Sequence, residues 1–252
     1  MSEGSSAVIR FHAVSKSFDG HRVLSDISFE VRRGEALCIL GRSGSGKSVT
    51  LKQINGLIKP DSGRVFVEEQ EVSVLRGAAL AQVRKKIGFL FQNAALFDSI
   101  TVGENVAFPL RRHTARSRSD IVRRAKQRLE ELGLEDVYER MPAAMSGGMK
   151  KRAGLARALV LDPSILLVDE PSSGLDPITA REIDELLIAQ KKDRKTTIVV
   201  VTHNIPSARR LGDTLALLHG GEIVAQGSPE ELENSDHPLV QEFLNPSGGA
   251  AR

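Results

Sequence analysis

A glycine-rich segment in the first fifth of the chain carries the residue types that could hold a phosphate group. Gly41-Arg-Ser-Gly-Ser-Gly-Lys-Ser48 matches the pattern GxxxxGK[ST]. Its glycines allow the backbone to curl so that N–H groups point at phosphate oxygens, and the N-terminus of a following helix adds partial positive charge. The lysine can reach the terminal phosphates, and the last hydroxyl can bind Mg²⁺. The predicted nucleotide-binding residues here are Gly41, Arg42, Ser43, Gly44, Ser45, Gly46, Lys47, Ser48 and Val49.

Two adjacent carboxylates follow a continuous apolar run. Ile165-Leu-Leu-Val precedes Asp169 and Glu170, which is the pattern of a buried strand that ends in acids. Asp169 could hold the Mg²⁺ of a nucleotide, directly or through water, and Glu170 could orient the attacking water or accept its proton. The alternative is a strand that simply ends in surface acids, and a phosphate loop in the same chain argues against it.

A second segment has the features of an anion site. Met145-Ser-Gly-Gly-Met149 precedes three basic residues and an apolar helical pattern. Ser146 can cap that helix, and Gly147 and Gly148 expose its first N–H groups. One chain does not need two phosphate clamps for one nucleotide, whereas a dimer can hold each nucleotide between the phosphate loop of one chain and this helix of the other. The sequence therefore favours a homodimer.

With these three motifs the chain resembles the ATP-binding subunits of ABC transporters over nearly its whole length. The resemblance implies an α/β P-loop NTPase fold with a mostly parallel core sheet, an N-terminal antiparallel β subdomain and an inserted α-helical subdomain. It implies a single domain over residues 7–244, with the core at about 7–93 and 164–244, the helical insertion with the signature motif at about 94–163, and flexible tails at 1–6 and 245–252. The implied activity is hydrolysis of ATP with Mg²⁺.

The same resemblance assigns further residues by their position. Gln92 matches the glutamine that joins the core to the insertion and senses the γ-phosphate and Mg²⁺, and His203 matches the histidine that contacts the γ-phosphate. Phe18 matches the aromatic that stacks on adenine, and residues 173–176 match the loop that crosses the dimer. The implied catalytic residues are Lys47, Gln92, Glu170 and His203, the implied Mg²⁺ ligands are Ser48, Gln92 and Asp169, and the nucleotide-binding set is completed by Phe18, Ser146, Gly147, Gly148 and Asp176. Taken alone, a glutamine or histidine is more often structural, and Phe18 could instead belong to the core.

The chain departs from the family pattern at three positions. Met145 and Met149 flank Ser-Gly-Gly where leucine and glutamine are usual, and Asn204 follows the histidine where aspartate is more usual. These changes concern the dimer contacts and leave the groups that polarise phosphate in place.

One branch of the family matches best. The Ser-Gly-Gly-Met signature, the segment 91–110, the run 176–179 and the C-terminal run 238–244 resemble ATPases of Mla/MCE-type lipid transport systems, also called toluene-tolerance ATPases. The resemblance implies a peripheral homodimer on the cytoplasmic face of the inner (plasma) membrane, under separate integral permease subunits. An MCE-domain lipid-binding protein and a small cytoplasmic accessory subunit would complete the system. The cargo would be phospholipid or a related hydrophobic molecule, and no nucleic-acid partner is expected.

Three alternatives remain open at this point. An importer of a polar solute such as an amino acid would use the same ATPase chemistry with another permease. A soluble ABC-type ATPase that acts on ribosomes or DNA usually has two cassettes or a long coiled coil, and this chain has neither. A regulator that binds nucleotide without hydrolysis is disfavoured by the presence of Glu170 and His203. Eight basic residues between positions 111 and 128 could form a patch for anions, although a solvated helix and loop explain them more simply.

The elements that must position these residues follow from local patterns of apolar residues. Strands are expected over 8–14, 27–31, 36–40, 65–67, 87–91, 165–168, 197–201, 214–218 and 222–225. Helices are expected over 47–57, 101–108, 120–132, 147–161 and 179–191, with a short one after Ser228. The first ninety residues thus contain mainly strands, and the middle of the chain is helical.

The composition fits this organisation. The 252 residues are 40% hydrophobic and 27% charged, which excludes a disordered or collagen-like chain. The single cysteine, Cys38, cannot form an internal disulfide, so a reducing compartment fits. The first six residues have neither a basic region nor an apolar stretch, so we expect no signal peptide.

Overall fold

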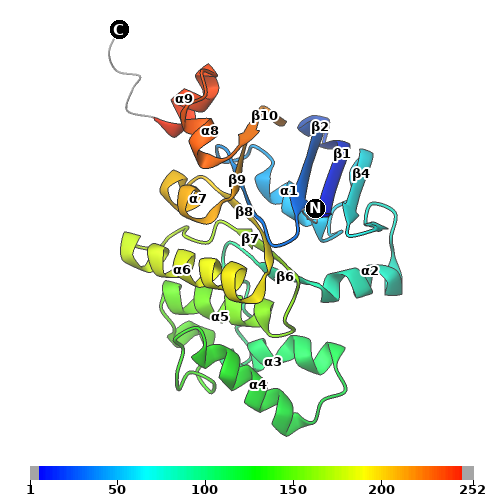
Figure 1. Cartoon of the computed structure of the whole chain (residues 1–252). Helices are drawn as coiled ribbons and strands as arrows, with labels where there is room; N and C mark the ends of the chain where they lie inside the picture. Colours follow the sequence, from blue (N-terminus) through cyan, green and yellow to red (C-terminus); the bar gives the residue numbers. More distant parts are fainter. Residues whose placement is uncertain (1–5, 246–252) are drawn as a thin grey trace, which may run out of the picture. The chain divides into compact units, whose positions relative to one another are not determined.

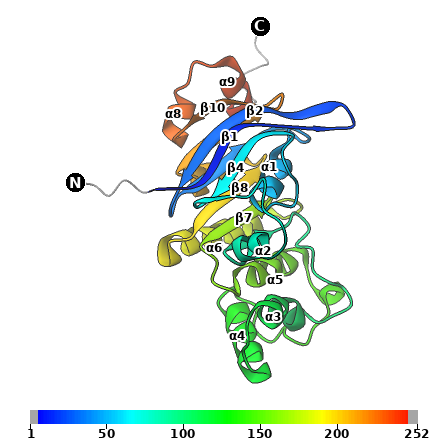
Figure 2. The same ribbon diagram turned by 90° about the vertical axis from the view of Figure 1, so that its right-hand side faces the viewer.

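Four strands near the N-terminus form an antiparallel sheet in the order β2-β1-β4-β5 (Figures 1 and 2). They are β1 (Ala7–Phe18), β2 (His21–Arg32), β4 (Ser62–Val67) and β5 (Gln70–Glu71). Alternate residues of β2 are buried from Ile27 to Val31, and the rings of Phe11 in β1 and Phe29 in β2 stack with their centroids 4.4 Å apart. The computed structural model describes residues 6–245, so the predicted flexible tails lie almost wholly outside the described residues.

The chain divides into two compact units, and the first contains residues up to Val83 and from Thr197 onward. Besides the antiparallel sheet, this unit has the core strands β3 (Ala36–Leu40), β8 (Thr197–Thr202), β9 (Thr214–His219) and β10 (Glu222–Gly227), in the order β10-β9-β3-β8. Strand β3 runs parallel to both β8 and β9, and β9 and β10 form the expected hairpin. Its complete helices are α1 (Lys47–Ile54), α7 (Ile205–Leu211), α8 (Pro229–Glu233) and α9 (Pro238–Leu244).

The second unit covers residues from Arg84 to Thr196. It contains the parallel strands β6 (Ile87–Leu90) and β7 (Ile165–Asp169), a 3₁₀ turn (Pro142–Ala144), and the helices α3 (Val102–His113), α4 (Arg118–Glu130), α5 (Gly147–Leu159) and α6 (Pro177–Arg194). Helix α5 packs against α3, α4, α6 and β6, so it is central to this unit. The expected combination of an antiparallel N-terminal sheet, a mostly parallel core and a helical segment is confirmed.

Side-chain caps define where the helices begin. Thr101 starts α3 with a capping box that Glu104 completes, and Ser228 and Glu231 do the same for α8. The hydroxyl group of Ser117 caps α4 by accepting a hydrogen bond from Asp120 N. Each cap satisfies backbone N–H groups that the helix itself leaves without partners.

Three differences from the sequence expectations concern helices. Helix α2 (Gly77–Lys85) lies in a region where mainly strands were expected; it buries only Leu80 and Val83, so its apolar pattern is weak. Helix α3 continues through Pro109 to its C-cap, Thr114, although the proline cannot donate a hydrogen bond to the preceding turn. The C-terminal run forms a helix, α9, and its Val240 and Leu244 are buried within the chain.

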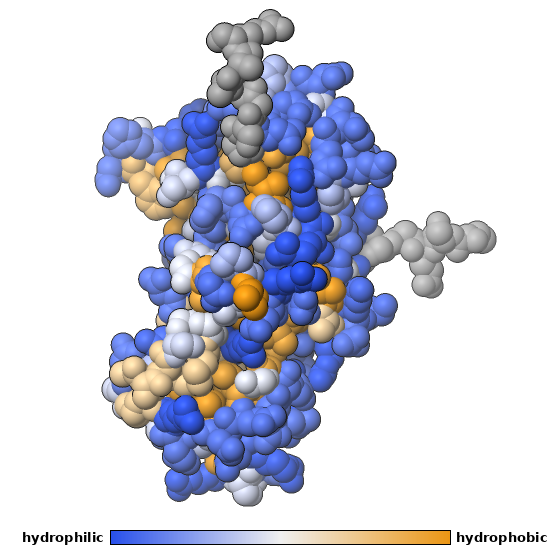
Figure 3. Space-filling model, turned by 90° about the vertical axis from the view of Figure 1, so that its left-hand side faces the viewer, coloured by the Kyte–Doolittle hydropathy of each residue, from blue (hydrophilic) through white to orange (hydrophobic). Residues whose placement is uncertain are grey.

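Polar side chains cover most of the face shown in Figure 3, and hydrophobic ones gather there in separate groups. Among the described residues, the exposed large hydrophobic side chains are Phe18, Leu57, Val74, Phe97, Phe108, Met141 and Ile178. No helix among residues 6–245 combines the length and the apolar character that a membrane span requires.

Candidate nucleotide-binding site

The phosphate loop connects β3 to α1. Gly44 and Gly46 have φ angles of 80° and 100°, which favour glycine. A methyl group on Gly46 would lie 2.9 Å from the carbonyl oxygen of Val23, and one on Gly41 would lie 2.5 Å from that of Leu218. Gly46 is also the N-cap of α1 and offers no side-chain cap, so the first N–H groups of this helix suit an anion.

Lys47 lies in the first turn of α1 and is only 6% exposed. Its ammonium donates to the carbonyl oxygens of Gly41, at 2.8 Å, and Arg42, at 3.0 Å. The lysine is thereby folded back over its own loop. The guanidinium of Arg42 pairs with the Glu242 carboxylate of α9 at 2.7 Å, with both side chains largely exposed.

His203 leaves the core at the same edge as the phosphate loop. Leu40 at the end of β3 is the direct partner of Thr202 at the end of β8, and the two strands run parallel. The residues that follow these strands therefore emerge side by side. Asn204, where aspartate is more usual, caps α7 by accepting from Ser207 N at 3.1 Å.

Phe18 ends β1 at the hairpin to β2, where it pairs with His21. Its side chain is 40% exposed, so the alternative that it belongs to the core is wrong. The ammonium of Lys16 lies 5.3 Å from the ring centroid. This ring can offer a face to a base.

In the second unit, Gln92 and the two acids share an edge. Leu90 of β6 pairs with Val168 of β7 in parallel register, so Gln92 and Asp169 follow neighbouring strand ends. The Gln92 side-chain amide donates to Ser173 Oγ at 3.5 Å. Asp169 and Glu170 are 5% and 7% exposed, and Glu170 has a φ of 46°, which is unusual for a residue with a side chain.

Lys151 also belongs to this cluster, and sequence reasoning missed it. It is 5% exposed, and its ammonium donates to the carbonyl oxygen of Glu170 at 2.9 Å and to that of Gln92. Burial lowers the pKa of Lys151, although the charges of Asp169 and Glu170 act in the opposite direction. The sequence did contain a signal for the burial of Lys151. The lysine lies four residues before Leu155, which places both on the apolar face of the helix.

The Ser-Gly-Gly segment begins α5. Ser146 is the N-cap, and its hydroxyl accepts from Met149 N at 3.3 Å. Gly147 and Gly148 form the first turn, and a methyl group on Gly148 would lie 2.5 Å from Thr179 Cγ2. The segment thus lies against the start of α6.

Asp176 is the N-cap of α6. Its carboxylate accepts from Thr179 Oγ1 at 2.6 Å and from the N–H groups of Ile178 and Thr179 at 3.0 Å each. These hydrogen bonds, led by the one from the Thr179 hydroxyl, lower the pKa of Asp176. Its predicted part in nucleotide binding stays a prediction.

The predicted site residues therefore divide between the units. Phe18, His203 and the loop 41–49 belong to the first unit, and Gln92, Asp169, Glu170, Ser146, Gly147, Gly148 and Asp176 belong to the second. The hydroxyl of Ser48, the amide oxygen of Gln92 and the carboxylate of Asp169 are the oxygen donors that Mg²⁺ prefers. Among residues 6–245 no cluster of three His, Cys, Asp or Glu side chains could hold a metal ion.

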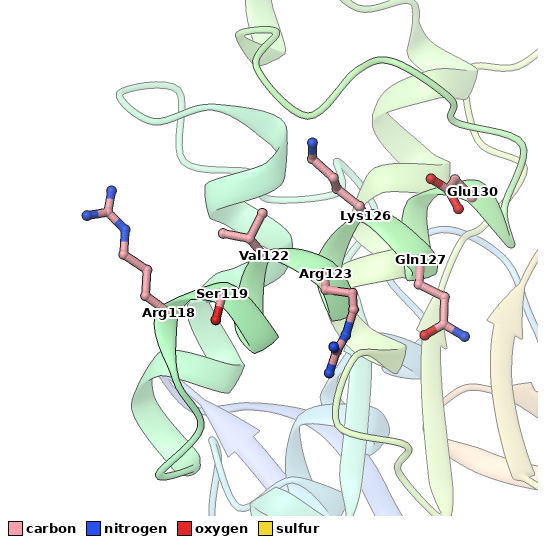
Figure 4. Close-up of a pocket in the computed structure, with 7 residues that line it drawn as sticks. All are labelled: Arg118, Ser119, Val122, Arg123, Lys126, Gln127 and Glu130. Atoms are coloured by element: carbon pink, nitrogen blue, oxygen red, sulfur yellow. The ribbon is translucent and has the colours of Figure 1, made fainter.

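A shallow hollow runs along the basic helix α4. Figure 4 shows that all seven of its lining residues come from this one helix and that their side chains spread apart. Arg123 pairs with Asp120 on the same helix. The surface fits the simpler interpretation of the basic segment as a solvated helix.

Comparisons with known proteins agree with this geometry. A family model described as ABC transporter matches residues 24–173, more than half of the chain. The solved dimer of the ATP-binding cassette MJ0796 in a post-hydrolysis state, bound to ADP and Pi, has a TM-score of 0.82 and 33% identity, and the match covers 87% of this chain and 98% of that one. The fold is therefore that of an ABC-type P-loop ATPase, as expected.

Curated relatives extend the similarity. The probable ribonucleotide transport ATP-binding protein mkl of Mycobacterium leprae is 40% identical over 237 residues, which cover 94% of this chain and 68% of the relative. The methionine import ATP-binding protein MetN of Bradyrhizobium diazoefficiens is 38% identical over 94% of this chain and 70% of its own length. Protein TRIGALACTOSYLDIACYLGLYCEROL 3, chloroplastic, of Arabidopsis thaliana is 38% identical over 96% of this chain and 75% of its own length. The chain belongs to the ABC transporter family, and it is the ATP-binding, ATP-hydrolysing subunit of such a transporter.

Proposed function

We propose that this ATPase powers the movement of phospholipid or a related hydrophobic molecule through a separate membrane permease. The observation that carries the nucleotide chemistry is the glycine loop at the start of α1, with Lys47 folded back over it. Backbone N–H groups of the loop bind the phosphates of ATP, and Lys47 exchanges its two carbonyl partners for phosphate oxygens.

Hydrolysis proceeds by in-line attack of water on the γ-phosphorus, while the bond from that phosphorus to the bridging oxygen breaks and ADP leaves. Glu170 orients the water and takes its proton, while Gln92 and His203 contact the γ-phosphate. Ser48, Asp169 and Gln92 would hold Mg²⁺ together with phosphate oxygens, and the ion would supply positive charge to the transferred group when bound. Losing one such preorganised donor typically raises the barrier by ~2.7–4 kcal/mol.

Two copies of the chain form the working unit. The N-terminus of α5, with Ser146, Gly147 and Gly148, binds the nucleotide held by the phosphate loop of the partner. Binding of two ATP molecules closes the dimer, and hydrolysis with phosphate release reopens it.

A groove in the second unit supports docking of the permease. It is lined by the stacked rings of Phe89 and Phe91 and by the half-exposed rings of Phe97 and Phe108. The groove has a volume of about 320 Å³, and its lining residues Arg84 and Lys85 carry positive charge. Aromatic walls with a basic border suit a short amphipathic segment of the permease that carries carboxylates.

The transported molecule is inferred separately from the ATPase chemistry. The relatives divide, because one name refers to ribonucleotide transport, one to methionine import and one to a galactolipid. The Ser-Gly-Gly-Met signature and the segment 91–110 favour lipid transport with an MCE-domain protein and a small accessory subunit, at the cytoplasmic face of the inner membrane. Import of a polar solute is the second candidate, and the methionine-import relative supports it.

Purification from the native membrane in a mild detergent tests the cargo. Proteins and lipids that accompany the chain are identified by mass spectrometry, with total membrane lipid as the control for passive carry-over. A permease with an MCE-domain protein and selectively enriched phospholipid supports lipid transport. A permease with a soluble binding protein and no lipid enrichment contradicts it in favour of polar-solute import, and recovery of ribosomes or DNA without a permease contradicts both.

A further inference from the structure

Lys151 is a buried cation that takes no part in the proposed reaction. Placing an ammonium group away from water is costly unless hydrogen bonds or charges compensate it. Lys151 meets this need with the carbonyl oxygens of Glu170, at 2.9 Å, and Gln92. Its position is therefore fixed by the loop that follows β6 and by the loop that follows β7.

The hydrogen bond to Glu170 acts on an unusual backbone. With a φ of 46°, Glu170 adopts a left-handed conformation that is costly for a residue other than glycine and persists only when its surroundings hold it. The carbonyl oxygen of Glu170 accepts from Lys151 and also from Ser173 N at 3.2 Å. The direction of the Glu170 carboxylate thus depends on a conformation that Lys151 helps to maintain.

The other hydrogen bond reaches Gln92 through its backbone carbonyl oxygen and does not involve its side chain. The Gln92 amide nitrogen lies against Ser173 Oγ, in the loop after Glu170. One ammonium group consequently joins the two loops that carry the proposed γ-phosphate sensor and the proposed base.

The lysine also connects these loops to the signature end of α5. Lys151 lies five residues after the N-cap Ser146, so about 7.5 Å of one rigid helix separates them. We propose that Lys151 is a positioning residue, which sets Gln92 and Glu170 relative to the helix end that binds the partner's nucleotide. This inference rests on the proposed roles of Gln92, Glu170 and Ser146.

Lys151→Met keeps the apolar stem of the side chain and removes its hydrogen-bond donors. Lys150→Met is the matched control, because Lys150 immediately precedes Lys151 on the same helix and is only half-buried. We expect Lys151→Met to lower the kcat of ATP hydrolysis by about tenfold to a hundredfold, the effect of a misplaced reacting group. The Kd for a non-hydrolysable ATP analogue, measured calorimetrically, should stay within about twofold because the phosphate loop is untouched. Lys151→Arg retains the charge and donors and should recover a large part of kcat.

Turnover of Lys151→Met equal to that of Lys150→Met would overturn the proposal. So would a joint loss of turnover, analogue binding and thermal stability that Lys151→Arg does not restore, because that pattern indicates a purely structural role. Glu170→Gln is measured in parallel. Wild-type turnover in that variant refutes the proposed base, whereas an inactive Glu170→Gln with an active Lys151→Met refutes only the positioning role.

Discussion

Gly148 and Thr179 leave no space between them for a side chain. A methyl group on Gly148 would lie 2.5 Å from Thr179 Cγ2, and the hydroxyl of that threonine is held by Asp176 at 2.6 Å. The start of α5 and the start of α6 therefore approach each other through a glycine and a threonine whose hydroxyl group is held in place.

Gly148→Ala tests this contact. The added methyl group forces Thr179 to move, so we expect the free energy of unfolding to fall by about 1–3 kcal/mol. Gly147→Ala is the matched control, because its methyl group would meet Leu175 at an ordinary 3.6 Å. Urea unfolding of both variants makes the comparison, and equal stability of the two would show that the contact is soft.

Glu170→Gln separates ATP binding from hydrolysis. The amide cannot accept the proton of the attacking water, so we expect turnover to fall by about 10²–10⁴-fold. ATP binding should remain, and size-exclusion chromatography with ATP should show a stable dimer. Undiminished hydrolysis would mean that the base lies elsewhere.

Mixed dimers test whether the signature acts on the partner's nucleotide. Lys47→Ala disables the phosphate loop, and Ser146→Arg blocks the start of α5. If each nucleotide lies between these two elements of different chains, a dimer of one chain of each kind contains one intact site and one doubly damaged site. Mixing the inactive variants should restore part of the ATPase activity, and a mixture as inactive as its parents contradicts the arrangement.

Arg128 offers a test of the second unit's stability. Its side chain is 1% exposed and donates to Glu131 and Asp162 at 2.6 Å each. Arg128→Met should lower the free energy of unfolding by about 1–3 kcal/mol, less than a fully buried pair because both carboxylates retain contact with water. Arg123→Met on the same helix, whose side chain is 77% exposed, should change it by less than about 1 kcal/mol. Similar losses in the two variants would contradict this interpretation.

The sequence predicted the core strands and most capped helices because their signals are local. The apolar run of β3 and the Ser228-Pro229 start of α8 are of this kind. Helix α2 was missed because it buries only two residues, and the continuation of α3 past Pro109 was missed because a proline normally ends a helix.

The places of Lys47 at the start of α1 and of Asp169 at the end of β7 could be predicted from the glycine loop and the apolar run before them, while their roles stay predictions. For Lys151 the helix pattern indicates only a buried position, because its partners are carbonyl oxygens of two distant loops. A backbone oxygen has no sequence signature, so only the structure identifies this contact.

The pairing of Leu40 with Thr202 has a consequence for synthesis of the protein. The chain between these strands includes the whole second unit, so a ribosome working at ~5–20 residues per second needs on the order of ten seconds or more to make it. During this interval the phosphate loop exists without β8 and without His203. The parallel pairing of β3 with β8 therefore forms late in synthesis. Until then the growing chain lacks the strand that precedes His203.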